Sequence, residues 1–210
     1  TGNITNHTNL RSTGNENYGI YALGAVSNYG NIDFSQGIGN VGAYSYVEGA
    51  TTTPNAIRNY GTISVSKTDI SDPDNRKYGI GMAAGFGEEV PVGSGNYVVK
   101  GLGNIENYGT IKVTTPDSIG MYATGASSTA TNKGTINLSA ENTIGMYLDN
   151  GATGVNEGTI TTVGSPKGVK AVVLSNNSKL INRAGATINV NSPEGFAVFR
   201  VNSPETNVTI

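Results

Sequence analysis

Acidic side chains gather in two short stretches of this sequence, where they could bind a metal or transfer protons. Asp72 and Asp74 share one stretch with Arg76, and Glu88 is adjacent to Glu89 in the other. The aspartates offer the oxygen ligands that calcium prefers, but they lack the spacing and the closing glutamate of a helix–loop–helix calcium site. The simpler interpretation is a solvated turn whose charge Arg76 balances, and we therefore predict no metal site.

Catalytic chemistry finds little support elsewhere in the sequence. Adjacent residues of a strand point to opposite faces of the sheet, so Glu88 and Glu89 do not form a catalytic pair by themselves. The single histidine, His7, has no evident carboxylate partner, and the lack of cysteine excludes thiol nucleophiles, thiolate metal sites and disulfides together. No nucleophile elbow or phosphate-binding loop occurs in the sequence. We predict no catalytic residue and no cofactor.

The elements that must position these residues repeat along the chain. The segment Asn-x-Gly-Thr-Ile, or a close variant of it, begins at six asparagines: Asn28, Asn59, Asn107, Asn132, Asn156 and Asn182. The last three intervals are 25, 24 and 26 residues, which gives a period of about 25. A second segment follows with the same period, as in Ile-Gly-Met-Tyr at Ile119, and a weaker third strand precedes each asparagine. Three short strands in each period predict the coil of a parallel β-helix.

Composition favours the same fold. Of the 210 residues, 30 are glycine, and glycine costs roughly 1 kcal/mol at an interior position of a helix, so an all-β protein is expected. A net charge of −2 without clusters of Lys and Arg argues against binding to nucleic acid or to a membrane surface. We predict one β-helical segment over residues 1–210, a monomeric rod of six or seven coils with insertions at 48–54, 67–77 and 86–102.

Strand alternation predicts which side chains fill the core of the rod. In the strand after each asparagine, the first inward residue is an isoleucine, as in Ile111, Ile136 and Ile160. In the next strand we expect both the isoleucine and the methionine of Ile-Gly-Met to face inward, as in Ile119 with Met121. The corresponding inward pairs in other coils include Ile80/Met82, Ile144/Met146 and Val169/Ala171.

The outward residues of this second strand predict an apolar and aromatic stripe along the rod. Its expected members are Leu23, Tyr44, Ala83, Tyr122, Tyr147, Val172 and Phe199. Such a stripe could bind a sugar or a partner protein, or it could only stabilise the coils through stacking of its own side chains. A shorter outward stack is expected from the residues that follow three of the repeated asparagines, Tyr29, Tyr60 and Tyr108.

The repeated asparagines have a physical role of their own. Asparagine tolerates the left-handed backbone region, and its amide can bond to the copy in the next coil, so we expect the six to form a ladder. The glycine two residues after the asparagine, as at Gly61 and Gly109, is expected to have a positive φ.

These repeats resemble a known family. The alternation of NYGTI at Asn107 with SIGMYATG at Ser118 is similar to the passenger region of large monomeric autotransporter adhesins of Gram-negative bacteria, above all the long fusobacterial kind. The resemblance covers nearly the whole chain. It implies a right-handed parallel β-helix on the cell surface, anchored by an outer-membrane barrel that is not present in this chain. It also implies that the chain is a segment of a longer passenger whose partner is a host or bacterial cell-surface protein or glycan.

The insertions break the repeat and are where binding residues are most expected. Loops 67–77 and 86–102 leave one coil at two successive turns, and we predict that they contact each other in a protruding lobe. Phe86 and Tyr97 would be its apolar anchors. Its polar rim would consist of Asp72, Asp74, Arg76, Glu88 and Glu89. The alternative is a neutral insertion, since loops lengthen at little thermodynamic cost.

The function that these observations favour is attachment without catalysis. One alternative is a polysaccharide lyase or hydrolase on the same scaffold, which would need carboxylates stacked on one outward face. The outward position of the strand after each asparagine carries one carboxylate in six residues: Asp33, Ser64, Lys112, Asn137, Thr161 and Asn189. The other alternative is a spacer that binds no ligand.

Overall fold

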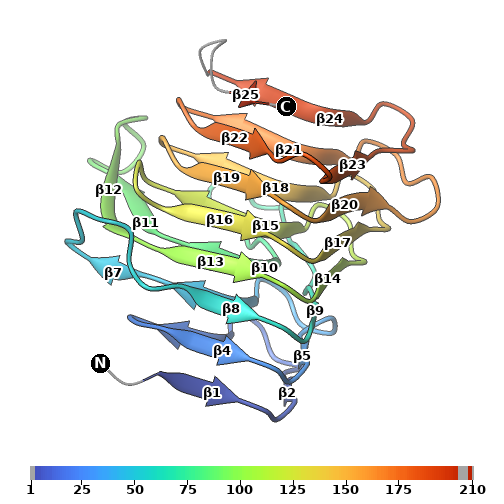
Figure 1. Ribbon diagram of the computed structural model, residues 1–210. Helices are drawn as coiled ribbons and strands as arrows, with labels where there is room; N and C mark the ends of the chain where they lie inside the picture. Colours follow the sequence, from blue (N-terminus) through green and yellow to red (C-terminus); the bar gives the residue numbers. More distant parts are fainter. Residues whose placement is uncertain (1–2, 203–207, 210) are drawn as a thin grey trace.

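The protein is a parallel β-solenoid with about eight turns of roughly 26 residues each, which confirms the expected fold class. The computed structural model describes residues 3–202 and 208–209, and within them the chain forms strands and turns but no α-helix. Figure 1 shows the turns stacked along one axis, from β1 (Ile4–Asn6) at one end to β25 (Val208–Thr209) at the other. The turn count exceeds the expected six or seven because β1 and β25 each add a strand to the stack.

Three parallel sheets run along the solenoid, one for each strand of the repeat. Sheet A consists of β1, β4 (Val26–Asn28), β8 (Ile57–Asn59), β13 (Asn104–Asn107), β16 (Thr129–Asn132), β19 (Thr153–Asn156), β22 (Lys179–Asn182) and β25. Sheet B consists of β2 (Leu10–Arg11), β5 (Ile32–Asp33), β9 (Thr62–Ser64), β14 (Thr110–Val113), β17 (Thr135–Leu138), β20 (Thr159–Thr162) and β23 (Thr187–Asn189). Sheet C consists of β3 (Tyr18–Ala22), β6 (Val41–Ser45), β10 (Ile80–Ala84), β15 (Ile119–Thr124), β18 (Ile144–Asp149), β21 (Lys170–Ser175) and β24 (Phe196–Val201).

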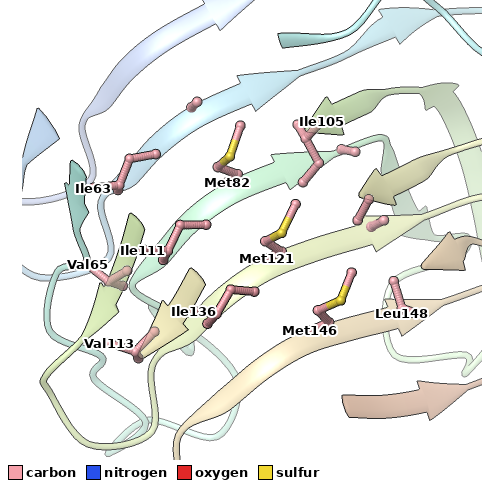
Figure 2. Packing of buried hydrophobic residues seen from close by; sticks show 14 of the residues in the cluster. Ile63, Val65, Met82, Ile105, Ile111, Val113, Met121, Ile136, Met146 and Leu148 are labelled. Atoms are coloured by element: carbon pink, nitrogen blue, oxygen red, sulfur yellow. The ribbon is translucent and has the colours of Figure 1, made fainter. Parts of the chain in front are cut away.

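The core lies between these sheets and repeats from turn to turn. Ile111 pairs with Ile136, Ile136 pairs with Ile160, and all three side chains have no exposed surface, as predicted. Met82, Met121 and Met146 form a parallel column from sheet C (Figure 2). Because each turn buries its apolar side chains against copies above and below, stacking is the source of the stability of the rod.

The isoleucine of Ile-Gly-Met does not face the core, contrary to the prediction. Ile119 lies on the outer face of sheet C, in a hollow described below, and Gly120 takes the inward place beside Met121. A Cβ atom on Gly120 would lie 3.0 Å from Cγ2 of Ile136 and 2.7 Å from the carbonyl oxygen of Gly145. The strand therefore presents two consecutive residues to the core, and only glycine fits at the first.

The strand Lys170–Ser175 differs from the predicted pairing register, although Val169 and Ala171 both lie in the core, as predicted. Lys170, not Val169, pairs with Ile144, so Val172 pairs with Met146 and is fully buried. The expected register is wrong here because the connection from β20 to β21 is longer than the one in the preceding turn, from β17 to β18.

The repeated asparagines lie in a buried column along sheet A. From Asn28 onward, each side-chain amide donates to the amide oxygen of the next, with N–O distances of 2.8–3.0 Å, and Asn6 joins the column by donating to Asn28 at 2.7 Å. Four members, Asn28, Asn59, Asn107 and Asn132, also donate to the carbonyl oxygen two residues on, as Asn28 does to Gly30 at 2.8 Å. The column thus satisfies polar groups that would be costly to bury unpaired.

The predicted left-handed backbone conformation at this corner is wrong. None of the six asparagines is among the residues with positive φ, and neither are Gly61 and Gly109. The glycines are needed for close approach instead: a Cβ atom on Gly109 would lie 2.1 Å from the carbonyl oxygen of Gly61. Successive turns pass so near each other at this corner that no side chain fits between them.

Candidate functional site

A three-stranded antiparallel side sheet projects from the solenoid where β10 ends. It consists of β7 (Val47–Glu48), β11 (Phe86–Glu89) and β12 (Tyr97–Leu102), and it lies beside the stack in Figure 1. Gly85, with a φ of +80°, turns the chain out of β10, and a Cβ atom there would lie 2.2 Å from the carbonyl oxygen of Thr124. The strands β11 and β12 form an antiparallel hairpin, in which Glu88 pairs with Val98 and Glu89 with Tyr97.

The side sheet joins the insertions 48–54 and 86–102. Gly101 pairs with Glu48, and the backbone N–H of Gly49 donates to the carbonyl oxygen of Lys100 at 3.0 Å. Insertion 67–77 lies before β10 and the hairpin lies after it, so the two emerge at opposite ends of the same strand. The predicted lobe of 67–77 with 86–102 is therefore replaced by a lobe of 86–102 with the 48–54 insertion.

The predicted residues of the hairpin have separate partners. Glu88 forms an ion pair with Lys100 at 3.0 Å, and Glu89 accepts a hydrogen bond from the backbone N–H of Gly93 at 2.8 Å. Phe86 meets the ring of Tyr46 edge-on at 5.7 Å between centroids. The two glutamates therefore do not converge on one point.

Tyr97 lies across the hairpin onto sheet C. Its ring lies over Gly87, where a Cβ atom would come within 2.2 Å of Cε1 of Tyr97, and its hydroxyl interacts with the hydroxyl of Tyr122. The hairpin glycine and the tyrosine of β15 together fix the position of this side chain.

Insertion 67–77 is a solvated turn held by its own backbone. Asp69 and Lys77 exchange two backbone hydrogen bonds, and the hydroxyl and N–H of Ser71 donate to Oδ1 of Asp69, which lowers the pKa of that carboxyl. Asp72 accepts from the N–H of Asp74 at 3.0 Å. Across the residues that the structure describes, no three His, Cys, Asp or Glu side chains are grouped so that they could hold a metal ion. Asp72, Asp74 and Arg76 are all exposed and lie in this turn, which precedes β10.

The outer face of sheet C carries the aromatic stripe, with two corrections to its membership. The observed column is Tyr21, Tyr44, Ala83, Tyr122, Tyr147, Val173 and Phe199. Tyr21 replaces the expected Leu23, and Val173 replaces Val172, which faces the core. Neighbouring rings are in contact, at 5.5 Å between Tyr21 and Tyr44 and 5.8 Å between Tyr122 and Tyr147.

The hairpin borders two hollows on this face. Phe86 lines the first, together with Tyr18, Tyr21, Tyr44 and Tyr46, in a volume of about 450 Å³. Tyr97 lines the second, a volume of about 300 Å³ formed with Tyr78, Ile80, Ile119, Tyr122, Ile144, Tyr147 and Asp149. Sequence reasoning missed the three isoleucines because it gave Ile-Gly-Met the wrong facing, and the signal that could have found them is the glycine that follows each isoleucine. It missed Tyr78 and Asp149 because they come from separate turns.

Tyr44 in the first hollow and Tyr122 in the second have raised pKa values. Burial raises the pKa of Tyr44, and the neighbouring phenols of Tyr18 and Tyr21 raise it further. Burial likewise raises the pKa of Tyr122, with a further contribution from Tyr97. Each ring therefore presents an uncharged, electron-rich face at physiological pH.

A second aromatic stack lies at the end of sheet A. His7, Tyr29, Tyr60 and Tyr108 follow one another at centroid distances of 5.0, 4.7 and 4.8 Å, and the ammonium group of Lys133 lies 4.9 Å from the centroid of Tyr108. The rings cover one another's faces, so this stack stabilises neighbouring turns and offers only ring edges to a partner.

The outer face of sheet B carries one column of mixed polar residues. Asp33, Ser64, Lys112, Asn137, Thr161 and Asn189 pair in that order. Asp33 accepts a hydrogen bond of 2.7 Å from the hydroxyl of Ser35, which lowers the pKa of its carboxyl. Asp33 is the one carboxylate in this column, and the residue paired with it in the next turn, Ser64, is not acidic.

Comparison with known proteins places the chain in a family. The sequence model described as the BigA third pectate lyase-like domain matches residues 1–159, which is 159 of the 210 residues. No curated protein and no solved structure matches the chain. Within the described residues, no helix is long and apolar enough to span a membrane. The matching domain is of a bacterial surface adhesin type. The chain therefore belongs to the family of the BigA third pectate lyase-like domain.

Proposed function

We propose that this domain is a rigid, non-catalytic part of a bacterial surface adhesin of the autotransporter kind, which attaches to a host or bacterial cell-surface protein or glycan. It is exposed outside the cell and held at the outer membrane by a part of the protein beyond this chain. The attachment surface is the hairpin lobe, defined as β7, β11 and β12, with the adjoining outer face of sheet C.

The observation that carries the proposal is the group of apolar side chains exposed on this lobe. Val92, at the hairpin tip, is 94% exposed, and Phe86, Tyr97 and Val98 are each 40–42% exposed. Tyr18 and Tyr21 extend the patch onto sheet C. Aromatic residues that are exposed and rimmed by charged residues such as Glu88 and Lys100 have the composition of a protein-binding surface.

The regular faces of the rod offer less to a specific partner. A column of repeated residues presents the same surface in every turn, so it binds in several registers alike. The hairpin lobe occurs once along the described turns and removes this ambiguity.

Attachment is tested with the purified domain and one pair of matched variants. The first variant shortens the hairpin by joining Gly87 to Lys100 through a tight turn, and the second shortens the solvated turn between Asp69 and Lys77 in the same way. Labelled domain should bind host or bacterial cells, the first variant should lose binding, and the second should keep it. Equal binding by the first variant and the intact domain would refute the lobe as the site.

The absence of catalysis needs its own assay. Incubation of the domain with polygalacturonate and other acidic polysaccharides should release neither unsaturated products nor new reducing ends. Release of either would make the domain an enzyme and contradict this part of the proposal.

A further inference from the structure

The second hollow on sheet C, lined by four tyrosines, three isoleucines and Asp149, has the construction of a ligand site. Tyr122 and Tyr147 come from adjacent strands, Tyr97 reaches in from the hairpin, and Tyr78 precedes β10. The isoleucines add an apolar lining: Ile119 is only 5% exposed, and Ile80 and Ile144 are partly buried. Aromatic side chains from four separate parts of the chain thus surround one space of about 300 Å³.

The only charged residue lining this hollow is Asp149. Its carboxylate already accepts three hydrogen bonds: from the N–H of Asn150 at 2.9 Å, from Nδ2 of Asn150 at 3.1 Å and from Nδ2 of Asn176 at 2.9 Å. A carboxylate has roughly four acceptor positions, so about one remains. What the group chiefly offers a ligand is therefore its negative charge.

The negative charge of Asp149 affects the pKa values of the surrounding tyrosines. Burial raises the pKa of Tyr97, Tyr122 and Tyr147, and the negative charge of Asp149 raises each of them further. The hollow therefore combines a carboxylate with neutral, electron-rich ring faces, and both attract a cation.

The geometry points to a binding site for a quaternary ammonium group of the choline type. A trimethylammonium group has no N–H to donate, so it needs ring faces and a nearby negative charge but few acceptors. The tyrosines, the isoleucine methyl groups and Asp149 supply this combination. This inference rests on the proposed function in one respect only, namely that the outer face of sheet C is a binding face. It adds the chemical class of the ligand that this face would bind.

Two other ligands fit the hollow less well. A sugar ring needs several unpaired donors and acceptors, whereas the hydroxyls of Tyr97 and Tyr122 interact with each other and with Thr124. A primary ammonium group, as in a lysine side chain, needs three acceptors for its N–H groups, and Asp149 has about one to give.

The test uses the intact domain and choline itself. Binding is followed by calorimetry and by the upfield shift of the N-methyl proton resonance, which tyrosine rings cause when they surround the group. The control ligand is the uncharged isostere of choline in which carbon replaces nitrogen. Choline should bind at least about tenfold more tightly than the isostere, a difference of ~1.4 kcal/mol. Equal binding of the two, no binding of choline, or tighter binding of butylamine or of a monosaccharide would each overturn the assignment.

Variants locate the site. Tyr147→Leu and Asp149→Asn should each weaken choline binding by about tenfold. Tyr147→Phe should keep it, because the ring remains, and Tyr60→Leu in the aromatic stack on sheet A should leave it unchanged. Melting temperatures of all four establish that they fold, and Tyr147→Phe keeps the test informative if Tyr147→Leu does not. Unchanged affinity in folded Asp149→Asn would overturn the role of its charge.

This assay is separable from the test of attachment. A domain that binds choline but not cells keeps the hollow and refutes the attachment proposal. A domain that loses cell binding when the hairpin is shortened, yet never binds choline, keeps the lobe and refutes the quaternary ammonium site.

Discussion

The Nδ2 atom of Asn132 lies 3.0 Å from the Oδ1 atom of Asn156 in the next turn, and both side chains have no exposed surface. Asn132 also donates to the carbonyl oxygens of Gly134 and Thr159, and its own amide oxygen accepts from Asn107 at 3.0 Å. One side chain therefore connects three consecutive turns. No other residue type of this size offers a donor and an acceptor in the required directions.

The first prediction is that Asn132→Ala lowers the free energy of unfolding by about 1–3 kcal/mol, because it leaves buried partners unsatisfied in the turns on either side. Urea denaturation followed by circular dichroism measures the change. Asn137→Ala, on the outer face of sheet B only five residues away, is the matched control and should change stability little. An Asn132→Ala protein as stable as the wild type would mean that the column contributes nothing.

The second prediction concerns the core. Ile136→Asp places an unpaired carboxylate where the side chain has no exposed surface, and it should cost several kcal/mol, enough to unfold the neighbouring turns. Asn137→Asp introduces the same group one residue later on the outer face and should stay within about 0.5 kcal/mol of the wild type. Thermal unfolding of the pair distinguishes them, and similar melting temperatures would contradict the inward position of Ile136.

A third prediction tests the glycine of Ile-Gly-Met. Gly120→Ala should destabilise the fold by about 1–3 kcal/mol, since the added methyl group meets a carbonyl oxygen at 2.7 Å and Ile136 at 3.0 Å. At Gly24 no atom lies within 4 Å of an added Cβ, and Gly24→Ala is expected to be nearly neutral. Denaturation midpoints of the two variants are measured in parallel with the wild type. An unchanged midpoint for Gly120→Ala would mean that a methyl group fits beside Ile136 and would contradict the crowding at this position.

The fourth prediction is a titration. The hydroxyl of Ser35 holds the pKa of Asp33 below its usual value, so the carboxylate contributes stability above its unfolded pKa and loses that contribution as the pH falls through its folded pKa. An unfolded aspartate has a pKa of about 3.9, and a carboxyl-carbon NMR titration should give Asp33 a midpoint below that value. Ser35→Ala should move the midpoint upward. A midpoint that is the same in both proteins would exclude the hydrogen bond as the cause.

The fold could be predicted from the sequence because its signals repeat. Ile111, Ile136 and Ile160 recur at one spacing, and the register of sheets A and B follows from that spacing alone. The register of sheet C does not follow from such a pattern, because simple alternation fails where Gly120 and Met121 both face inward. The crowding at Gly120 arises from the next turn, which a local pattern does not contain.

The candidate site could be predicted only in part, for a related reason. The strand character of residues 97–100 and the glycines on either side of them are local signals, and such signals can predict a hairpin around Tyr97. Its pairing with β7, about fifty residues earlier in the chain, depends on which loops emerge on the same side of the rod. The convergence of Tyr78, Tyr97 and Asp149 on one hollow likewise results from the stacking of separate turns.

The asparagine column also bears on how such a gene can change. Because Asn132, Asn156 and Asn182 occupy the same place in successive turns, an in-frame loss of residues 156–181 would join Val155 to Asn182 and bring Asn182 against Asn132. The rod would become shorter by one strand spacing, about 4.8 Å, while the hairpin lobe and the first hollow kept their surroundings. Recombination between neighbouring repeats can therefore change the length of the rod without altering the hairpin lobe.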